Sequence, residues 1–359
     1  MRSLLFLPLF ALSFLLLIGC SDFLYLSRLG WHQAGITFHS IPIQEVLKDE
    51  QADPAVREKI LLIQEVKGYG EETLGLRKTK SYLRFYEVKG PILHVVTASK
   101  KDRLKLYSWT FPIVGRVTYK GFFTREEAQR EQKRLEERGY DTCVQPSEAY
   151  STLGWLKDPI FSSMLGWDEG ILSNLILHEM VHGTIYFKGE TDFNEQMATF
   201  IGNRGAIDFL TERYGSESKE VQRAVQTQED DLLFSRWIDE AYEELSEFYS
   251  QSISTEEKLK RREEVFLSLQ EKFRGIKSQF KTEWYIKFDQ IPLNNAVLLA
   301  HRQYFHRLAL FETLYEYLGR DLKRMVEWMK EIRASGEEPV SYLNRWMKER
   351  GLTVSSFLR

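Results

Sequence analysis

The feature that most constrains the fold is an apolar run, residues 171–186, that contains two histidines and a glutamate. His178 and His182 are four positions apart, so on a helix both imidazoles point to one side and can bind one metal ion. Glu179 follows the first histidine and can act as a general base on a water at that metal. Burying these groups without a partner such as a metal would be costly. The run therefore predicts a helix with a hydrolytic zinc site. A chance match, or a surface helix with a salt-bridged Glu179, is the alternative.

A third metal ligand must come from elsewhere, because catalytic zinc sites usually have three protein ligands and an open fourth position. Glu195 is the leading candidate. It lies at the start of a second expected helix, after a turn at residues 188–191, and Asp192 is expected to cap that helix. A helix, turn and helix would bring Glu195 opposite His178 and His182. The sequence thus predicts one Zn²⁺ per chain, bound by these three residues.

The amino terminus has the pattern of a secretory signal, with Arg2 followed by an apolar core at residues 4–18. The core ends at Gly19-Cys20 in a sequence that resembles a bacterial lipobox. This resemblance implies cleavage before Cys20 and acylation of Cys20, which would attach the chain to a membrane. An uncleaved membrane helix is the alternative, although the run is short for a span. We expect residues 1–19 to be a signal peptide and residues 20–359 to form a single domain.

Localisation follows from the same segment. Ser21 does not signal retention in the inner membrane, by analogy with known lipoprotein sorting, so we expect a cell-envelope lipoprotein on the outer membrane, facing the periplasm. Cys143 is the only other cysteine, so no internal disulfide can form once Cys20 is lipidated, and Cys143 is expected to be a packed thiol.

Composition is that of a globular protein, with 43% hydrophobic residues and a net charge of −3. Lys and Arg are mixed with Asp and Glu, and no basic stripe with interleaved aromatic residues is present, so nucleic acid is not an expected partner. The hydrophobic pattern predicts an α+β fold that is predominantly α-helical. It has three expected parts: a strand-rich region at about 80–148, the metal-site helices at about 169–213, and a long helical hairpin with C-terminal helices at about 216–350.

Individual elements are predicted from capping residues and apolar spacing. A helical stretch is expected over 41–76, with Asp53-Pro54 opening a helix there. Capping boxes at Thr124 and Ser254 open two further helices, the second being the returning arm of the hairpin. Strands are expected at 82–88, 92–98 and 104–111 and near Cys143, and helices at 293–349 with a break at 336–339.

Three blocks of the chain together resemble a known family: residues 111–123, residues 149–159 and residues 178–198. The family is that of the putative bacterial lipoprotein aminopeptidases, which are regarded as gluzincin-type zinc peptidases. The resemblance implies a zincin-like metal helix pair. Gluzincins carry an Asn-Glu-x-x-Ala segment that maps here onto Asn194, Glu195 and Ala198. In better-known gluzincins the position four residues after this glutamate often holds an acidic partner of the first histidine, and this chain has Thr199 there. Either Thr199 or another carboxylate, such as Asp192, is then expected to orient His178.

The expected activity is hydrolysis of peptide bonds, with Glu179 transferring a proton from water to the leaving amine. Residues 294–296 followed by Tyr304 resemble a late block of the family, and this resemblance makes Tyr304 the candidate donor to the oxyanion. His301 and Tyr285 are alternatives, and a packed core tyrosine is the competing interpretation. A peptide or protein substrate is expected to bind near Gly154 and Trp155, which could form a strand edge or a plain loop.

Aminopeptidase activity is the favoured interpretation. No Gly-x-Met-Glu-Asn segment that would bind a free amino terminus is present, so an endopeptidase is an alternative. The alternative from another class is a zinc-binding envelope scaffold or chaperone that lacks turnover and binds partners through its helical hairpin. Glu179 argues against that alternative, because a structural zinc site does not need a base.

Overall fold

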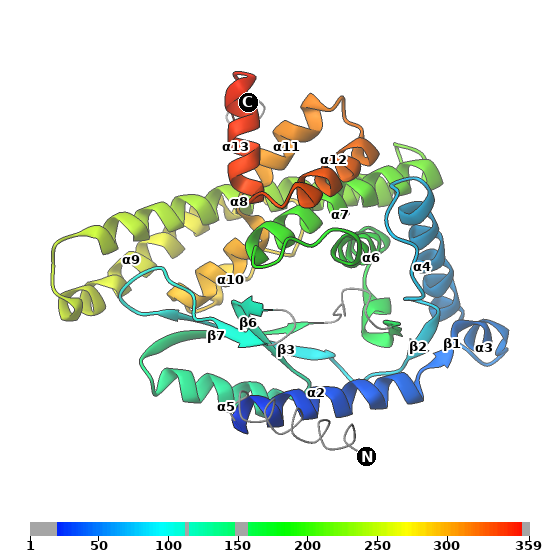
Figure 1. Ribbon diagram of the computed structural model, residues 1–359, viewed down its shortest axis with the longest axis horizontal. Coiled ribbons are helices and arrows are strands. Elements are labelled where there is room, and N and C mark those ends of the chain that lie inside the picture. Colours follow the sequence, from blue (N-terminus) through cyan, green and yellow to red (C-terminus); the bar gives the residue numbers. More distant parts are fainter. Residues whose placement is uncertain (1–19, 112–114, 148–156, 354–359) are drawn as a thin grey trace, which may run out of the picture.

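The computed structural model describes residues 20–111, 115–147 and 157–353. Most of these residues are helical and the rest include three small sheets, which confirms the expected α+β class with a helical majority. In Figure 1 the strands form a thin layer. Helices α2 (Cys20–His39) and α5 (Arg125–Glu136) lie along one side of it, and the remaining long helices lie on the other. No helix within the described residues is long and apolar enough to cross a membrane.

The central sheet is antiparallel, with the order β6-β3-β7. Its strands are β6 (Tyr119–Phe122), β3 (Leu93–Lys100) and β7 (Tyr140–Ser147). Alternate residues of β3 point to opposite faces, and Val96 and Ala98 pack fully buried against Ala128 and Leu135 of α5. Helix α10 (Asn295–Phe305) contacts the same sheet through β3 and β7. The sheet therefore carries β6, with Tyr119, between α5 and the helical part of the molecule.

Two smaller sheets complete the strand layer. One contains β1 (Ile41–Pro42), β2 (Arg84–Tyr86) and β8 (Ile160–Phe161), with β2 parallel to β8. The other pairs β4 (Trp109–Phe111) with β5 (Gly115–Val117). The expected strands near residues 84, 95 and 110 are present, but β2 and β4 are shorter than predicted. The expected helical stretch at 41–76 is interrupted: β1 comes first, and α3 (Ile43–Lys48) ends before Asp53 caps α4 (Pro54–Glu72).

The two helices expected to hold the metal are α6 (Glu169–Thr184) and α7 (Thr191–Tyr214), which pack closely against each other. Glycines allow this close approach. A Cβ added at Gly202 would lie 2.5 Å from Oδ1 of Asn174, and one at Gly205 would lie 2.8 Å from Cδ1 of Leu177. Helix α4 also approaches α6 closely, at Gly70. Because buried helices are close-packed, these contacts fix α6 relative to α7.

The prediction that Asp192 caps α7 is wrong. The cap position is Glu190, whose side chain makes no capping hydrogen bond, and Asp192 lies in the first turn of the helix. Asn194 stabilises the turn instead: its Oδ1 accepts from the backbone N of Phe187 at 2.9 Å, and its Nδ2 donates to the Phe187 carbonyl at 2.8 Å. This closed turn brings the start of α7 back beside the end of α6.

The long helical hairpin is present as α8 (Lys219–Ser250) and α9 (Thr255–Ile276), with Ser254 accepting from the backbone N of Glu257 as predicted. Aromatic side chains fill its core, including Phe234, Trp237 and Phe273. The Thr124 cap of α5 is likewise confirmed. Three short helices follow α10, and the last two are separated at residues 336–338 as predicted: α11 (Leu308–Tyr317), α12 (Leu322–Ser335) and α13 (Pro339–Glu349).

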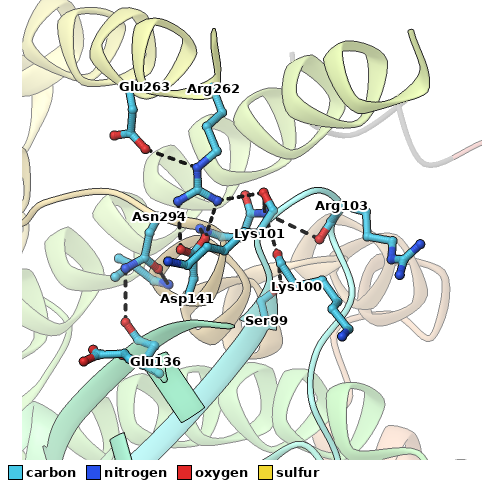
Figure 2. Close-up of polar contacts among 12 residues, drawn as sticks. Ser99, Lys100, Lys101, Arg103, Glu136, Asp141, Arg262, Glu263 and Asn294 are labelled. Carbon is cyan, nitrogen blue, oxygen red and sulfur yellow. Dashed lines mark hydrogen bonds and ion pairs between the residues drawn. The ribbon is translucent and has the colours of Figure 1, made fainter. Parts of the chain in front are cut away.

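A buried ion pair joins this hairpin to the central sheet. Figure 2 shows Arg262 of α9 pointing at Asp141 of β7. The guanidinium donates to both carboxylate oxygens, each at 2.8 Å, and to the Lys101 carbonyl at 2.7 Å. The backbone N of Asn295, at the start of α10, also donates to Asp141 at 3.2 Å. A bidentate pair of this kind fixes orientation as well as position, so α9, β7 and α10 are held together here.

Candidate metal centre

His178, His182 and Glu195 lie together in the structure. The three residues can each offer one ligand atom, and these atoms lie within 4.8 Å of one another. The two Nε2 atoms are 3.0 Å apart, and Oε2 of Glu195 lies 3.3 Å from Nε2 of His178 and 3.4 Å from Nε2 of His182. Tetrahedral zinc with bonds of about 2.0–2.2 Å separates its ligand atoms by about 3.3–3.6 Å. The spacing is thus close to that of three ligands around one zinc ion.

The helices explain this arrangement. The two histidines are one turn apart on α6, so their imidazoles share a face. Glu195 lies in the first turns of α7, which the closed turn at Asn194 places opposite that face. The sequence predicted that a helix, a turn and a second helix would bring His178, His182 and Glu195 together. The structure confirms that the three residues lie close together.

Burial makes the charges of this cluster strongly interdependent. His182 is 7% exposed and Glu195 is 6% exposed. Burial alone would raise the pKa of Glu195, but the two imidazoles outweigh it and hold that pKa well below its usual range. Burial alone would lower the pKa of His182, but Glu195 and then Glu179 raise it overall. The charge of Glu195 is therefore stabilised by the two imidazoles, and protonation of His182 is favoured by the carboxylates near it.

One polar atom of the cluster has no protein partner. Nδ1 of His182 is buried without a hydrogen bond within the described part of the chain. Neither Thr199 nor Asp192 bonds to His178 among the described contacts, and Asp192 instead accepts from Nε2 of Gln303 at 3.2 Å. The expected partner of His178 is therefore not found at either position. Two imidazoles and one carboxylate are a set of ligands that fits a divalent cation such as zinc.

Two tyrosines adjoin the cluster. The ring of Tyr304 lies 6.5 Å from the ring of His178, centroid to centroid, so this predicted residue is placed beside the site. The hydroxyl of Tyr119 donates to Oε1 of Glu195 at 3.4 Å. Glu195 and then burial raise the pKa of Tyr304, whereas burial and then Glu195 raise that of Tyr119. Both phenols therefore stay protonated at neutral pH and remain donors.

Tyr119 is the residue that sequence reasoning missed. It lies on β6, far upstream of α6 and α7 in the sequence, and no periodic spacing links a strand residue to these helices. The one sequence feature that pointed to Tyr119 was its position within residues 111–123, which is one of the three blocks that resemble the family.

The other candidates lie elsewhere. Tyr285 donates to Oδ1 of Asp231 at 2.5 Å, and the ring of His301 packs 5.0 Å from that of Phe288, in the aromatic core of the hairpin. Burial lowers the pKa of His301 to about 4, so it is a neutral core histidine. Gly154 and Trp155 lie outside the described residues. Cys143 packs against the hairpin core, and burial raises the pKa of its thiol to about 12, as expected for a packed thiol.

Comparisons with known proteins give one match. The model of a family described as "Putative aminopeptidase" matches residues 24–340, which is most of the chain. Neither the curated proteins nor the solved structures include a significant match. The matched region contains helices α6 and α7, Tyr119 on β6 and Tyr304 on α10. This chain belongs to the putative aminopeptidase family.

Proposed function

We propose that this protein is a zinc-dependent aminopeptidase with one Zn²⁺ per chain, bound by His178, His182 and Glu195. Family membership supports peptidase activity. The observation that carries the zinc assignment is the convergence of two imidazole Nε2 atoms and one carboxylate oxygen at 3.0–3.4 Å, in a buried cluster. A cluster with this donor set and spacing is typical of a catalytic zinc site with an open fourth position.

Glu179 is the proposed general base. It follows His178 on α6 and is only partly buried, so a substrate can approach it. Its charge contributes to raising the pKa values of His182 and Tyr304, which means that it lies close to the cluster. Bound zinc would supply Lewis acidity toward the scissile carbonyl. Glu179 then takes the proton of the attacking water and passes it to the leaving amine.

The two tyrosines have separate proposed roles. Tyr119 contacts Oε1 of Glu195, leaving Oε2 toward the histidines, so its hydroxyl would fix which carboxylate oxygen faces the metal. Tyr304 stacks beside His178 with a protonated hydroxyl and would donate a hydrogen bond to the oxyanion.

We also propose that the protein is a cell-envelope lipoprotein. The supporting observations come from the sequence: an apolar segment at residues 4–18 that ends at Cys20, the residue proposed to carry the lipid. Helix α2 begins at Cys20 and packs on the strand layer, so the lipid would be attached directly to the folded part of the molecule. An outer-membrane position facing the periplasm is part of this proposal.

Peptidase assays with two substrate sets test the function. Zinc content and cleavage are measured for the wild type and for Glu179→Gln, with peptides whose amino termini are free or blocked. The variant should keep zinc and lose about 10²–10⁴-fold in kcat/KM, because only the base is removed. Cleavage confined to free amino termini establishes an aminopeptidase, and cleavage of blocked peptides establishes an endopeptidase.

Glu212→Gln is the matched control, since it removes an exposed carboxylate from the same helix pair. It should leave zinc content and cleavage unchanged. A wild type that binds zinc but cleaves neither peptide set would favour the scaffold alternative instead.

A further inference from the structure

One buried glutamine of α10 links three segments of the chain. Gln303 is 3% exposed, and its Nε2 donates to Oγ1 of Thr118 and, at 3.2 Å, to Oδ1 of Asp192. A side-chain amide has two N–H groups, so it can make both bonds at once. Thr118 lies between β5 and β6, and Asp192 lies in the first turn of α7. The amide therefore joins the start of β6, the end of α10 and the start of α7.

The three hydrogen-bonded residues adjoin residues of the candidate metal centre in the sequence: Thr118 precedes Tyr119, Gln303 precedes Tyr304, and Asp192 comes three positions before Glu195. Three positions on α7 are nearly one helical turn. Tyr119, Tyr304 and Glu195 come from three elements that no short turn connects. Their relative positions therefore depend on contacts between these elements, and the amide of Gln303 supplies a polar contact to both of the others.

Hydrogen bonds add direction to the packing of α10. In Figure 1, α10 lies between the central sheet and α7, and it contacts both. The hydrophobic effect is non-directional, whereas a hydrogen bond has a preferred length and angle. A buried amide that loses a partner also leaves a polar atom unpaired, which is costly. The two bonds of Gln303 thus favour one position of α10 relative to β6 and α7.

We propose that Gln303 is a positioning residue of the metal centre, whose amide fixes β6, α10 and α7 relative to one another. This fixes the contact of the Tyr119 hydroxyl with Glu195. It also holds Tyr304 beside His178. The expected effects on zinc binding and turnover rest on the proposed function, whereas the junction of the three elements does not need a metal.

An exchange of hydrogen-bonding groups tests this role. Gln303→Glu places a carboxylate against the carboxylate of Asp192, so repulsion replaces the hydrogen bond. The double variant Gln303→Glu, Asp192→Asn restores the bond with donor and acceptor exchanged, and the Thr118 hydroxyl can rotate to donate. Zinc affinity, measured with a competing chelator, and kcat/KM should each fall by about 10–100-fold in the single variant. The double variant should recover most of both losses.

Hydrogen exchange of the metal-free protein gives a measurement that depends on neither zinc nor activity. Backbone amides of residues 117–122 and 191–197 should exchange faster in Gln303→Glu than in the wild type, because the junction between these segments opens more often. The double variant should exchange at wild-type rates. Faster exchange throughout the chain would show a loss of overall stability instead, and would count against a positioning role.

Gln222→Glu is the matched control, since Gln222 is exposed on α8, and it should behave like the wild type. Equal zinc affinity, turnover and exchange in Gln303→Glu and the wild type would overturn the proposal. So would a double variant as impaired as the single one, including the case in which neither variant folds. A wild type that binds no zinc or cleaves no peptide would refute the proposed function alone, and hydrogen exchange would still test the junction.

Discussion

Two buried carboxylates of this molecule, Asp141 and Glu195, have different partners for their negative charge. Asp141 is 5% exposed, and Arg262 neutralises it with two hydrogen bonds of 2.8 Å (Figure 2). Glu195 is 6% exposed, and its neighbours are two imidazoles at 3.3 and 3.4 Å and the Tyr119 hydroxyl at 3.4 Å. No Lys or Arg forms an ion pair with Glu195 within the described residues.

The difference shows what each cluster can do. The bidentate pair is complete within the chain, since its carboxylate has a permanent cation at short distance. The cluster around Glu195 lacks such a cation, and burying an unneutralised carboxylate is costly. A protonated imidazole can neutralise it in part, but a divalent cation can also use both Nε2 atoms. The first cluster is structural, and the second is suited to bind a metal.

Removal of Glu195 should have the largest effect. Glu195→Ala leaves two imidazoles and no carboxylate, so we expect loss of bound zinc and of detectable peptidase activity. Metal content by mass spectrometry and cleavage of a free peptide measure both. A variant that keeps one zinc per chain would show that Glu195 is not a ligand. Glu190→Gln, before the start of α7, is the control and should keep both zinc and activity.

Removal of Arg262 should be the most destabilising change in the other cluster. Arg262→Met leaves Asp141 buried without its cation, which costs about 3–5 kcal/mol of the free energy of unfolding. Urea unfolding followed by circular dichroism measures this difference. Glu263→Gln removes only the 65% exposed partner of Arg262 and should cost less than about 1 kcal/mol. Similar losses for the two variants would contradict the structural role of the pair.

Removal of the Tyr119 hydroxyl should have an intermediate effect on the metal centre. Tyr119→Phe keeps the ring but frees Oε1 of Glu195, so zinc affinity or kcat/KM should fall by about 10–100-fold. Zinc titration with a competing chelator separates affinity from turnover. Tyr304→Phe should instead lower kcat and keep zinc affinity. An unchanged affinity in Tyr119→Phe would mean that other contacts orient Glu195.

Replacement of both members of the ion pair should have the smallest effect. The variant Asp141→Leu, Arg262→Met removes both charges together, and buried pairs replaced in this way often cost little or stabilise. We expect its free energy of unfolding to lie within about 2 kcal/mol of the wild type, well above that of Arg262→Met alone. A double variant as unstable as the single one would indicate that other contacts, such as that with Asn295, dominate.

Much of the fold and of the metal cluster could be predicted because the signals are local. His178 and His182 are one helical turn apart in the sequence. Each capping box, at Thr124 and at Ser254, is a pattern of four residues that marks the start of a helix. The position of Glu195 could be predicted because a short turn leaves few ways for two adjacent helices to pack. The prediction of the helix cap failed because two neighbouring polar residues could stabilise the same turn. Asn194, and not Asp192, stabilises the turn between α6 and α7.

Contacts between segments that are far apart in the sequence could not be predicted from the spacing of residues along the chain. Tyr119 reaches Glu195 only because the central sheet and α7 both pack against α10. The pairing of Asp141 with Arg262 likewise joins segments far apart in sequence, and either charge alone is indistinguishable from a surface residue. Tyr304, by contrast, was proposed from a resemblance and lies beside His178.

Zinc-dependent stability of the wild type tests the central claim most directly, which is that the buried cluster of His178, His182 and Glu195 is incomplete without a divalent cation. Thermal unfolding is measured after chelation and again after addition of zinc, with native mass spectrometry to count bound ions. We predict one zinc per chain and a clear rise in Tm, because a ligand that binds only the folded state stabilises it. An unchanged Tm with no bound zinc would contradict the account.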